Sequence, residues 1–429
     1  MNLGSVTMLG KADGLASTRI NTIVEHEEKM YIGCDDGAIF IKDGANITPI
    51  NLVIQENEIG IRDFVIDDEG TVWVASYMGL LKFKNNNQKL ITTKEGLSSN
   101  LVRKILRTKD KKLWLATKSG GVIRYGGENN IQIFNVDNHL KSNYILALEE
   151  DNYGNVVVGT HSGGLSIIGS DTIVTHFIPD ISGALIFNIH VDQKNRYWLS
   201  TNTGIFVFDM GGFRKIEFNT EFKVETIFDF VPDIVGNVWL TTNIGIGRVV
   251  FNDLNGFLEG SIERVDVELF DNYDGMTTKE CTGATRSLLT SKGEVWIPTI
   301  DGIAIINNDR LQKNLQVPEI IITSLIVDND QMPSATHKIE SGKVRYEIEY
   351  ASTSYLVPEK VRFRYKLSGV DRDWIVTSKR SVEYTNLAPG AYTFSVVGSN
   401  GNNVWNEEGD QISFIVEPFY YQTWWFYLL

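Results

Sequence analysis

The sequence predicts an all-β protein, with a seven-bladed β-propeller followed by an immunoglobulin-like β-sandwich. Three observations predict this fold. A unit of roughly 42 residues recurs seven times, each unit has the pattern of four short strands, and a tyrosine-corner motif stands in the segment after the last unit. We expect the propeller to occupy 1–312 and the sandwich to occupy 313–417.

The repeat is marked by a lead residue, usually aromatic, and by a glycine six positions later. A small residue, usually Thr or Ser, stands between them, as in WLATKSG at 114–120 and WLSTNTG at 198–204. The lead residues are separated by 42, 41, 43, 41, 41 and 57 residues, which indicates one insertion in the last unit. They stand at positions 31, 73, 114, 157, 198, 239 and 296.

Each unit predicts four strands. The first alternates apolar residues, as at 101–108, and a tight turn such as 67–73 connects it to the strand that carries the lead residue. The third strand follows the glycine, as at 79–84, and a weaker fourth strand ends the unit. The turn needs a residue with positive φ, which is glycine in most copies and Asn195 in one. Calcium binding is the alternative for these Asp-x-x-Gly turns, but their spacing does not match a calcium loop.

The two ends of the repeat predict a closed ring. Residues 7–15 align with 91–97, so the chain begins with a fourth strand that has no blade of its own. We expect this strand to complete the seventh blade, which would leave no unpaired sheet edge. The recurring tryptophans are expected to pack between blades and not to form a sugar-stacking platform.

Composition excludes several functions. The 54 acidic and 40 basic side chains give a net charge of −14, which argues against binding to nucleic acid or to an anionic lipid surface. The two cysteines, Cys34 and Cys281, lack the paired spacing of a zinc site, and no cofactor is implied. A disulfide between them at the seam of blades 1 and 7 is one alternative. The first residues show no signal-peptide pattern.

Two stretches resemble a known repeat. Residues 96–125 resemble the two-component regulator propeller repeat of bacterial membrane-bound sensors, and 271–307 resemble the terminal propeller repeat of those sensors. Residues 318–416 resemble the Y_Y_Y domain that follows the propeller, and 387–392 separately reads as a tyrosine corner. The positions that match the namesake tyrosines are Tyr365, Tyr384 and Tyr392. Many members of this family carry two successive propellers, whereas this chain carries one.

The resemblance also implies a place at a membrane. Residues 418–429 resemble the juxtamembrane segment of these sensors, with the start of a transmembrane helix that the chain cuts short. Trp424, Trp425 and Tyr427 would then form an interfacial aromatic belt, and Leu428 and Leu429 would open the helix. The alternative is a packed terminal segment. The implied location is the periplasmic or extracellular side of the bacterial inner membrane.

Candidate ligand-binding residues lie on one face of the expected propeller. Loops between the second and third strands, and loops between blades, emerge on this face, and their residues vary while the repeat stays constant. The alternative for each residue is a solvated loop position. The candidates are Arg19, Asp35, Tyr77, Asn100, Lys118, Asn143, His161, Asn202, Asn243 and Lys279.

These features predict the ligand-sensing region of a membrane-spanning signalling protein. The family suggests a carbohydrate breakdown product as the small-molecule ligand. We expect the sandwich to pass the signal to the membrane helix within a homodimer. No catalytic or metal-binding residue is predicted, because the six histidines are scattered without ligand spacing. One alternative is a lyase or hydrolase in which His161 acts with Glu280 or Asp301 at the mouth of the ring. A pure protein-interaction scaffold is another, disfavoured because the loop residues are mostly polar.

Overall fold

The protein is described by a computed structural model. The model describes residues 6–52, 60–85, 87–127, 129–162, 164–170, 172–178, 183–219, 224–283, 286–308, 311, 316–333, 338–354, 360–400, 404–422 and 426.

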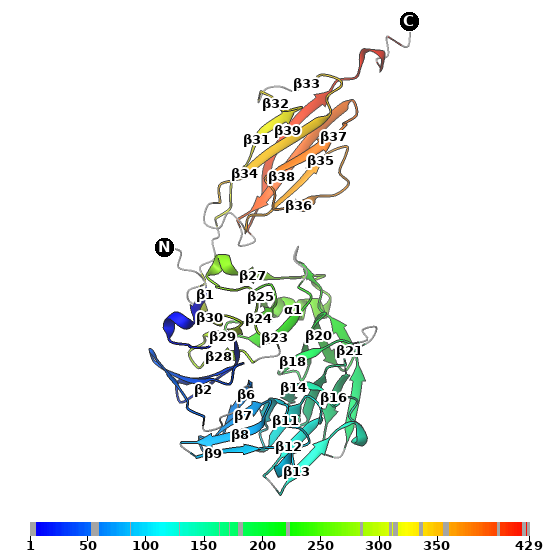
Figure 1. Ribbon diagram of the computed structural model, residues 1–429. Helices are drawn as coiled ribbons and strands as arrows, with labels where there is room; N and C mark the ends of the chain where they lie inside the picture. The colour runs from blue at the N-terminus through cyan, green and yellow to red at the C-terminus, as the bar shows by residue number, and fades with distance from the viewer. Residues whose placement is uncertain are drawn as a thin grey trace. The chain divides into compact units, whose positions relative to one another are not determined.

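The chain divides into two compact units, Met1–Leu311 and Gln312–Leu429. Within the described residues, the first unit contains seven four-stranded antiparallel sheets, and the second contains one four-stranded and one five-stranded sheet. Figure 1 shows the sheets of the first unit following one another in chain order, from blue to yellow-green. The all-β fold with a propeller and a following sandwich, predicted from the sequence, is confirmed.

Blades 1 to 3 each consist of four consecutive strands, ordered from the axis outwards. Blade 1 contains β2 (Ile20–His26), β3 (Lys29–Cys34), β4 (Ile39–Asp43) and β5 (Asn46–Pro49). Blade 2 contains β6 (Ile61–Ile66), β7 (Val72–Ser76), β8 (Gly79–Lys84) and β9 (Asn87–Ile91). Blade 3 contains β10 (Val102–Arg107), β11 (Leu113–Thr117), β12 (Val122–Tyr125) and β13 (Ile131–Phe134).

The next three blades repeat this order. Blade 4 contains β14 (Ile145–Glu150), β15 (Val156–Thr160), β16 (Gly164–Ile168) and β17 (Ile173–Phe177). Blade 5 contains β18 (Ile186–Val191), β19 (Tyr197–Thr201), β20 (Gly204–Asp209) and β21 (Gly212–Lys215). Blade 6 contains β23 (Ile227–Pro232), β24 (Asn237–Thr242), β25 (Ile246–Val250) and β27 (Glu268–Phe270). A short parallel pair, β22 (Phe218–Asn219) with β26 (Val265–Asp266), lies beside them.

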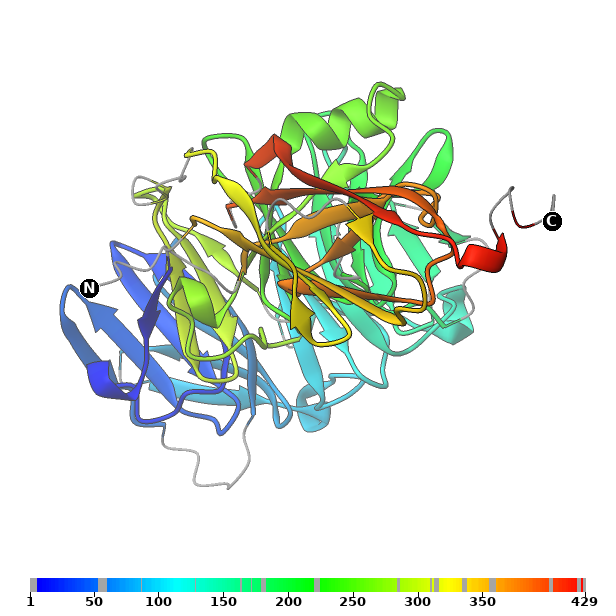
Figure 2. The ribbon, with the colours of Figure 1, turned by 90° about the horizontal axis from the view of Figure 1, so that it is seen from above.

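The seventh blade combines both ends of the first unit. It contains β28 (Leu288–Leu289), β29 (Val295–Thr299) and β30 (Gly302–Ile306), and β1 (Val6–Leu9) pairs antiparallel with β30. Figures 1 and 2 show the blue β1 beside the yellow-green strands of this blade. The innermost strands contact one another in the circular order β2, β6, β10, β14, β18, β23, β28 and back to β2, so the ring is closed.

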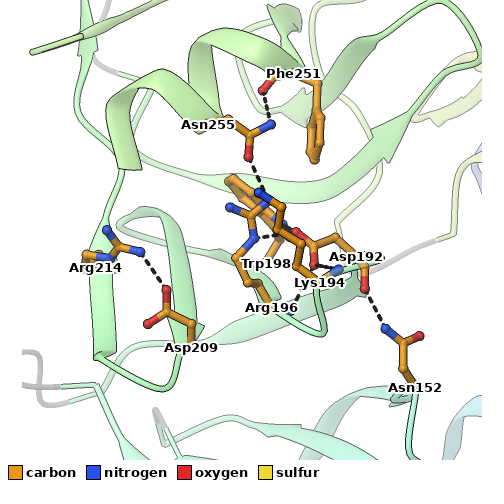
Figure 3. Close-up of polar contacts among 9 residues, drawn as sticks. All are labelled: Asn152, Asp192, Lys194, Arg196, Trp198, Asp209, Arg214, Phe251 and Asn255. Atoms are coloured by element: carbon orange, nitrogen blue, oxygen red, sulfur yellow. Dashed lines mark hydrogen bonds and ion pairs between the residues drawn. The ribbon is translucent and has the colours of Figure 1, made fainter. Parts of the chain in front are cut away.

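The one α-helix among the described residues accounts for the longer spacing before the last lead residue. Helix α1 (Phe251–Glu259) lies between β25 and β27, so this insertion belongs to the sixth blade. Figure 3 shows how α1 is held: Arg196 donates from Nη2 to Asn255 Oδ1 at 2.8 Å and from Nε to Asp192 Oδ2 at 2.6 Å. The helix of blade 6 is therefore attached to blade 5.

The aspartates of the Asp-x-x-Gly turns bind protein groups. Asp67 Oδ1 accepts from the backbone N–H groups of Glu69 at 3.0 Å and Thr71 at 2.9 Å, and Oδ2 accepts from the Trp73 indole at 3.0 Å. Asp192 and Asp233 accept from their own blade tryptophans in the same way. These contacts support the turn interpretation, because the carboxylate oxygens are occupied by the turn and the lead residue.

Blade tryptophans pack against neighbouring blades, as the repeat predicts. Trp198 is fully buried, and its ring stacks on Phe230 of blade 6 with 5.0 Å between ring centres. Trp73 of blade 2 meets Tyr125 of blade 3 edge to face at 6.0 Å. Burying a side chain of this size stabilises the ring by several kcal/mol, on the order of 25 cal/mol per Å² of apolar area.

The second unit is a β-sandwich. One sheet has the order β32 (Asp330–Gln331), β31 (Ile320–Val327), β34 (Arg345–Ser352) and β37 (Ser381–Thr385). The other has the order β33 (Lys338–Ile339), β39 (Trp405–Val416), β38 (Gly390–Ser399), β35 (Phe363–Leu367) and β36 (Ile375–Thr377). Tyr392 donates its hydroxyl to the Ala388 carbonyl at 2.8 Å, which confirms the tyrosine corner. The hydroxyl of Tyr384 binds Asp371 at 2.6 Å, and Tyr365 stacks on the core residue Phe394 at 5.8 Å.

Two further expectations concern the cysteines and the C-terminal segment. Cys34 and Cys281 are both buried and free, so the disulfide considered from the sequence is not formed. Burial raises the pKa of each thiol to about 12, which makes both unreactive.

None of the helices in the described ranges is long and apolar enough to cross a membrane. The expected aromatic belt and the two terminal leucines, Trp424, Trp425, Tyr427, Leu428 and Leu429, lie outside the described residues.

Candidate functional site

In six of the seven blades, the turn between the second and third strands is held by a buried hydroxyl, and in blade 1 the buried Cys34 occupies this position. In blade 3, Thr117 Oγ1 donates to the Gly121 carbonyl at 2.8 Å and accepts from the Gly120 N–H at 2.8 Å. These contacts require Thr or Ser three positions after the lead residue and leave the next position free to vary. The same hydroxyl-to-carbonyl bond is made by Ser76, Thr160, Thr201, Thr242 and Thr299.

The variable position is fixed in space by its backbone. The N–H of Lys118 donates to the Leu101 carbonyl at 2.9 Å, and the N–H of His161 donates to the Tyr144 carbonyl at 3.1 Å. Asp35 bonds to Arg19 in the same way at 3.0 Å. Each acceptor is the residue directly before the innermost strand of the same blade. The variable side chains are therefore held beside the start of the inner strands.

Two arginines and two tyrosines meet at this position from blades 2, 3 and 4. We call Arg62, Tyr77, Arg103 and Tyr144 the arginine–tyrosine cluster. Arg103 donates from Nη1 to the hydroxyls of Tyr77 at 3.2 Å and Tyr144 at 3.4 Å. The guanidinium carbon of Arg62 lies 5.3 Å from the centre of the Tyr77 ring, and that of Arg103 lies 5.7 Å from the centre of the Tyr144 ring. Both distances are within the range of cation–π attraction.

Blade 1 adds a carboxylate to the cluster. Asp35 Oδ1 lies 3.2 Å from Arg62 Nη1 and accepts from Asn21 Nδ2 at 2.9 Å, while its Oδ2 lies 3.5 Å from Arg19 Nε. Asp35 therefore neutralises part of the charge at the blade 1 end of the cluster.

Blades 3 and 4 extend the cluster at its other end. Lys118 Nζ lies 5.9 Å from the centre of the Tyr144 ring, and His161 stacks on that ring with 4.6 Å between centres and 9° between planes. Both side chains are exposed. The structure thus connects five residues predicted from the sequence through contacts with the cluster: Arg19, Asp35, Tyr77, Lys118 and His161.

Burial and repulsion act on the central arginines. The Arg62 side chain is only 11% exposed, and its pKa is lowered, first because burial removes the guanidinium from water and then because Arg103 lies close by. Among the described residues, Arg103 has no carboxylate within ion-pair distance. The positive charges of Arg62 and Arg103 therefore lie close together, and the only counter-charge described for them, Asp35, contacts Arg62 and not Arg103.

Three other predicted residues stabilise loops. The side-chain oxygen of Asn100 accepts from the Thr93 N–H at 2.8 Å, and that of Asn143 accepts from the Val136 N–H at 3.0 Å. Asn202 accepts from the Leu185 N–H at 2.8 Å. These amides hold the chain where it passes from one blade to the next or into a blade.

The last two predicted residues lie in blades 6 and 7. Asn243 is exposed on its turn, with no contact to the cluster among the described residues. Lys279 pairs with Asp271 at 3.2 Å, and its Nζ lies 5.8 Å from the centre of the Tyr273 ring. The structure does not connect either of them to the arginine–tyrosine cluster.

Sequence reasoning missed Arg62 and Arg103, since it considered loop positions alone. It also missed Tyr144, a loop residue next to the candidate Asn143. Arg62 and Arg103 occupy the second residue of an inner strand, where an otherwise regular repeat changes its residue type. That variation could have identified them. In blades 5 and 6 the position holds Phe187 and Phe228, whose rings meet edge to face at 5.4 Å. The equivalent residues in the first six blades are Asn21, Arg62, Arg103, Leu146, Phe187 and Phe228.

A second charged group lies deeper, along the inner strands. The fully buried Asp63 accepts from Thr22 Oγ1 at 3.2 Å and from the Ile105 N–H at 3.1 Å, and its carboxylate lies 3.6 Å from Arg286 Nη2. Asp229 of blade 6 makes equivalent contacts, because its carboxylate accepts from the Asn188 side chain and from the Ser287 N–H. Each aspartate therefore joins both of its neighbouring blades.

The charges along the inner strands perturb one another. The pKa of Lys104 is lowered because the ammonium group is buried, although Asp63 opposes this shift. Burial raises the pKa of Glu149, while nearby Arg286 and Lys104 oppose the shift. Asp63 raises the pKa of Arg286. These groups partner one another across blades, so we assign them to closure of the ring.

Little in the described structure resembles a catalytic centre. No group of three His, Cys, Asp or Glu residues that could hold a metal ion occurs in the described ranges. No hydrogen bond or ion pair among those residues joins His161 to Glu280 or Asp301, the acids considered for an enzyme. The geometry of His161 is that of a ring stacked on Tyr144.

Comparison with known proteins confirms the resemblance seen in the sequence. Residues 354–417 match the family model of the Y_Y_Y domain. Histidine kinase P4 of Formosa agariphila is 24% identical over 442 residues, an alignment that covers 92% of this chain and 31% of that protein. The chain thus spans about a third of the length of this curated relative.

Solved structures share the fold. A chain assigned as the extracellular domain of a hybrid two-component system of B. thetaiotaomicron has a TM-score of 0.76 at 20% identity, and the match covers 97% of this chain and 58% of that one. Another, assigned to a one-component system of the same organism, has a TM-score of 0.57 at 15% identity, with 96% and 59% covered. Virginiamycin B lyase from Staphylococcus aureus has a TM-score of 0.56 at 14% identity, with 70% and 98% covered. At these identities the likeness shows the fold alone.

Proposed function

We propose that this chain is the extracytoplasmic ligand-sensing region of a membrane-spanning bacterial signalling protein. The propeller binds a small extracellular ligand, such as an oligosaccharide, through the face formed by blades 1 to 4. The sandwich relays the bound state to a transmembrane helix beyond Leu429. This proposal includes the division into a propeller at 1–312, a sandwich at 313–417 and a juxtamembrane segment at 418–429.

The arginine–tyrosine cluster is the observation that carries the proposal. The repeat keeps its packing residues constant, yet it places arginines, tyrosines, a lysine and a histidine side by side on one face. Tyrosine and arginine side chains are enriched among the residues that contribute most to binding energy. The similarity to extracellular domains of two-component systems and to a histidine kinase supports a sensing role.

Relay through the sandwich requires a difference in affinity. A ligand shifts the equilibrium between two signalling states only if it binds one state more tightly than the other. A homodimer offers two such states, because ligand binding changes the stability of one arrangement of the protomers relative to another. We therefore propose that the region works as a homodimer on the periplasmic or extracellular side of the membrane.

Titration calorimetry tests the binding step. The 429-residue chain is titrated with panels of oligosaccharides, amino acids and peptides, and the ligand found is then titrated into the variants Arg103→Gln and Arg107→Gln. Arg107 is a matched control, because it lies on the same strand with its charge paired to Asp68 at 2.8 Å. We expect Arg103→Gln to weaken binding at least tenfold, or about 1.4 kcal/mol, and Arg107→Gln to leave it unchanged. Silence across all panels would contradict a small-molecule sensor.

The alternative is a propeller enzyme, a lyase or hydrolase, and its test uses the same ligand. After prolonged incubation with the protein, mass spectrometry of the recovered ligand distinguishes the two functions. An unchanged ligand supports a sensor. Turnover that disappears in His161→Gln would instead establish an enzyme.

A further inference from the structure

The arginine–tyrosine cluster carries more positive charge than the described carboxylates around it neutralise. Arg19, Arg62, Arg103 and Lys118 contribute four positive charges, and the one carboxylate ion-paired with them among the described residues, Asp35, contacts only Arg19 and Arg62. Asp35 is already contacted by Arg19, Arg62 and Asn21. This concentration of positive charge occurs in a chain whose net charge is −14. The excess is therefore local and opposite in sign to the molecule as a whole.

Arg103 is the side chain whose charge is least compensated. Its two hydrogen bonds, to the Tyr77 and Tyr144 hydroxyls, both leave from Nη1. In the part of the chain that the structure describes, its Nε and Nη2 groups donate to no protein acceptor. A guanidinium presents its N–H groups as a planar fork that matches the two oxygens of a carboxylate or sulfate group. The two tyrosines orient this fork without neutralising it.

Arg62 adds a second buried positive charge beside Arg103. Its side chain is only 11% exposed, and both the loss of hydration and the nearby Arg103 lower its pKa. Holding two guanidinium groups together at a partly buried position costs free energy, which an anion between them would offset. The deeper charges do not supply that anion, because Asp63 and Asp229 are occupied by inner-strand donors and by Arg286.

The aromatic side chains beside the arginines indicate the kind of group that the ligand carries next to its negative charge. Tyr144 and His161 form a nearly parallel stack next to Arg103 and Lys118. Farther round the ring the inner-strand position becomes apolar, with Phe187 against Phe228. A ligand that binds here thus meets cations from blades 1 to 3 and flat or apolar side chains beside them. A ring that carries an acidic group fits this combination.

We propose that the arginine–tyrosine cluster binds a ring-shaped ligand through an anionic group, a carboxylate or a sulfate, held by Arg62 and Arg103. This inference rests on the proposed sensing function and narrows its ligand to an acidic sugar or another cyclic acid. The anionic group accepts charge-assisted hydrogen bonds from both arginines, and the ring of the ligand packs beside Tyr144 and His161. Lys118 supplies a third cation on the open side of the cluster.

A matched pair of small ligands tests the proposal without knowledge of the natural ligand. Methyl glucuronide and methyl glucoside differ only in a carboxylate against a hydroxymethyl group, and inorganic sulfate serves as the third probe. Each is titrated into the isotope-labelled 429-residue chain at constant ionic strength, maintained with sodium chloride. The arginine Nε–Hε signals are followed by NMR, and those of Arg62 and Arg103 are assigned from the spectra of Arg62→Gln and Arg103→Gln.

Methyl glucuronide should shift the Arg62 and Arg103 signals in a saturable manner, while methyl glucoside should leave them in place. A shift by sulfate as well indicates a general anion site, and a response to the glucuronide alone indicates a carboxylate site. Either outcome supports the proposal. The Arg107 signal should not respond, because its guanidinium is paired with Asp68 by two hydrogen bonds at 2.8 and 2.9 Å.

Two results would overturn the proposal. One is an equal response to the glucuronide and the glucoside, and the other is no response of either arginine to any of the three probes. Both leave the sensing function standing if the calorimetric panels yield a neutral ligand, since they concern only the charge of that ligand. The sensing function fails separately, when no class of small molecule binds. The matched ligands are compared on the wild-type chain, and the glutamine variants serve only to assign the two arginine signals.

Discussion

Arg286 Nη2 lies 3.6 Å from Asp63 Oδ2, and this ion pair joins the seventh blade to the second, across the blade between them. Asp63 is fully buried and also accepts from Thr22 and from the Ile105 N–H, so one carboxylate connects four blades of the ring. A buried carboxylate with this set of donors stabilises closure because its removal leaves the donors and the cation unpaired.

Replacing Asp63 with asparagine should destabilise the propeller by about 3 kcal/mol, because Arg286 loses its counter-charge and one amide group faces N–H donors. Urea unfolding followed by tryptophan fluorescence measures the change. Asp68→Asn is the control, since Asp68 forms an exposed pair with Arg107. Its unfolding midpoint should stay close to that of the wild type. Equal effects of the two variants would contradict a closing role for Asp63.

His190 should make stability depend on pH. Burial lowers the pKa of this imidazole below its usual value near 6.5, although Asp229 and Asp192 act in the opposite direction. The unfolded chain therefore takes up the proton first as the pH falls. Stability is complete above about pH 6.5 and is lost below it, by at most about 1.4 kcal/mol per pH unit, until the folded pKa is reached.

His190→Phe removes this titratable group and keeps an aromatic ring beside Phe230. In the wild type, the centres of the two rings lie 5.4 Å apart. The difference in unfolding free energy between wild type and variant should therefore change below about pH 6.5 and stay constant above it. A constant difference across the whole pH range would show that His190 does not titrate as argued.

Gly79 should tolerate no side chain. Its φ is 137°, and a Cβ atom there would lie 2.3 Å from the Ile91 carbonyl oxygen. We expect Gly79→Ala to cost about 3 kcal/mol of stability. The comparison is Gly70→Ala, where φ is 77° and no atom lies within 4 Å of the added Cβ, so only backbone strain of about 1 kcal/mol remains. The denaturant midpoints of the two variants measure this difference. The prediction is wrong if Gly70→Ala lowers stability as much as Gly79→Ala does.

The two parts of Tyr144 should contribute differently to binding. Its hydroxyl accepts from Arg103, while its ring stacks on His161. Tyr144→Phe should weaken the binding of methyl glucuronide modestly, by about threefold, since Arg103 loses an orienting contact. Tyr144→Leu should weaken it at least tenfold, because both the stack and the hydroxyl are lost. Equal affinities of the two variants, measured by NMR titration, would exclude a role for the ring.

The blade pattern could be predicted from the sequence because each of its marks has a local cause. Thr117 must bond to the Gly121 carbonyl, Gly79 must approach Ile91, and Asp67 must cap its own turn. All three contacts lie within one blade and recur at one period. Helix α1 has no such repeat, and its attachment depends on Asn255 meeting Arg196, which is 59 residues away in the chain.

The candidate site was only partly visible in the sequence. The loop positions of Asp35, Tyr77, Lys118 and His161 vary, and the structure does connect them. Asn100 does not belong to the cluster, since it caps the backbone of its own loop. Arg62 and Arg103 were missed because a strand residue of a propeller is expected to pack, and whether it points to a neighbour or to the mouth depends on the curvature of the ring. That curvature is a property of seven blades together and not of any one of them.

A crystal structure of the 429-residue chain, with a ligand identified by calorimetry, tests the account most directly. The account expects the ligand to lie against Arg62 and Arg103, with an anionic group within hydrogen-bond distance of both and a ring beside Tyr144. A ligand bound at the opposite face of the propeller, or on the sandwich with the arginine–tyrosine cluster empty, would contradict it.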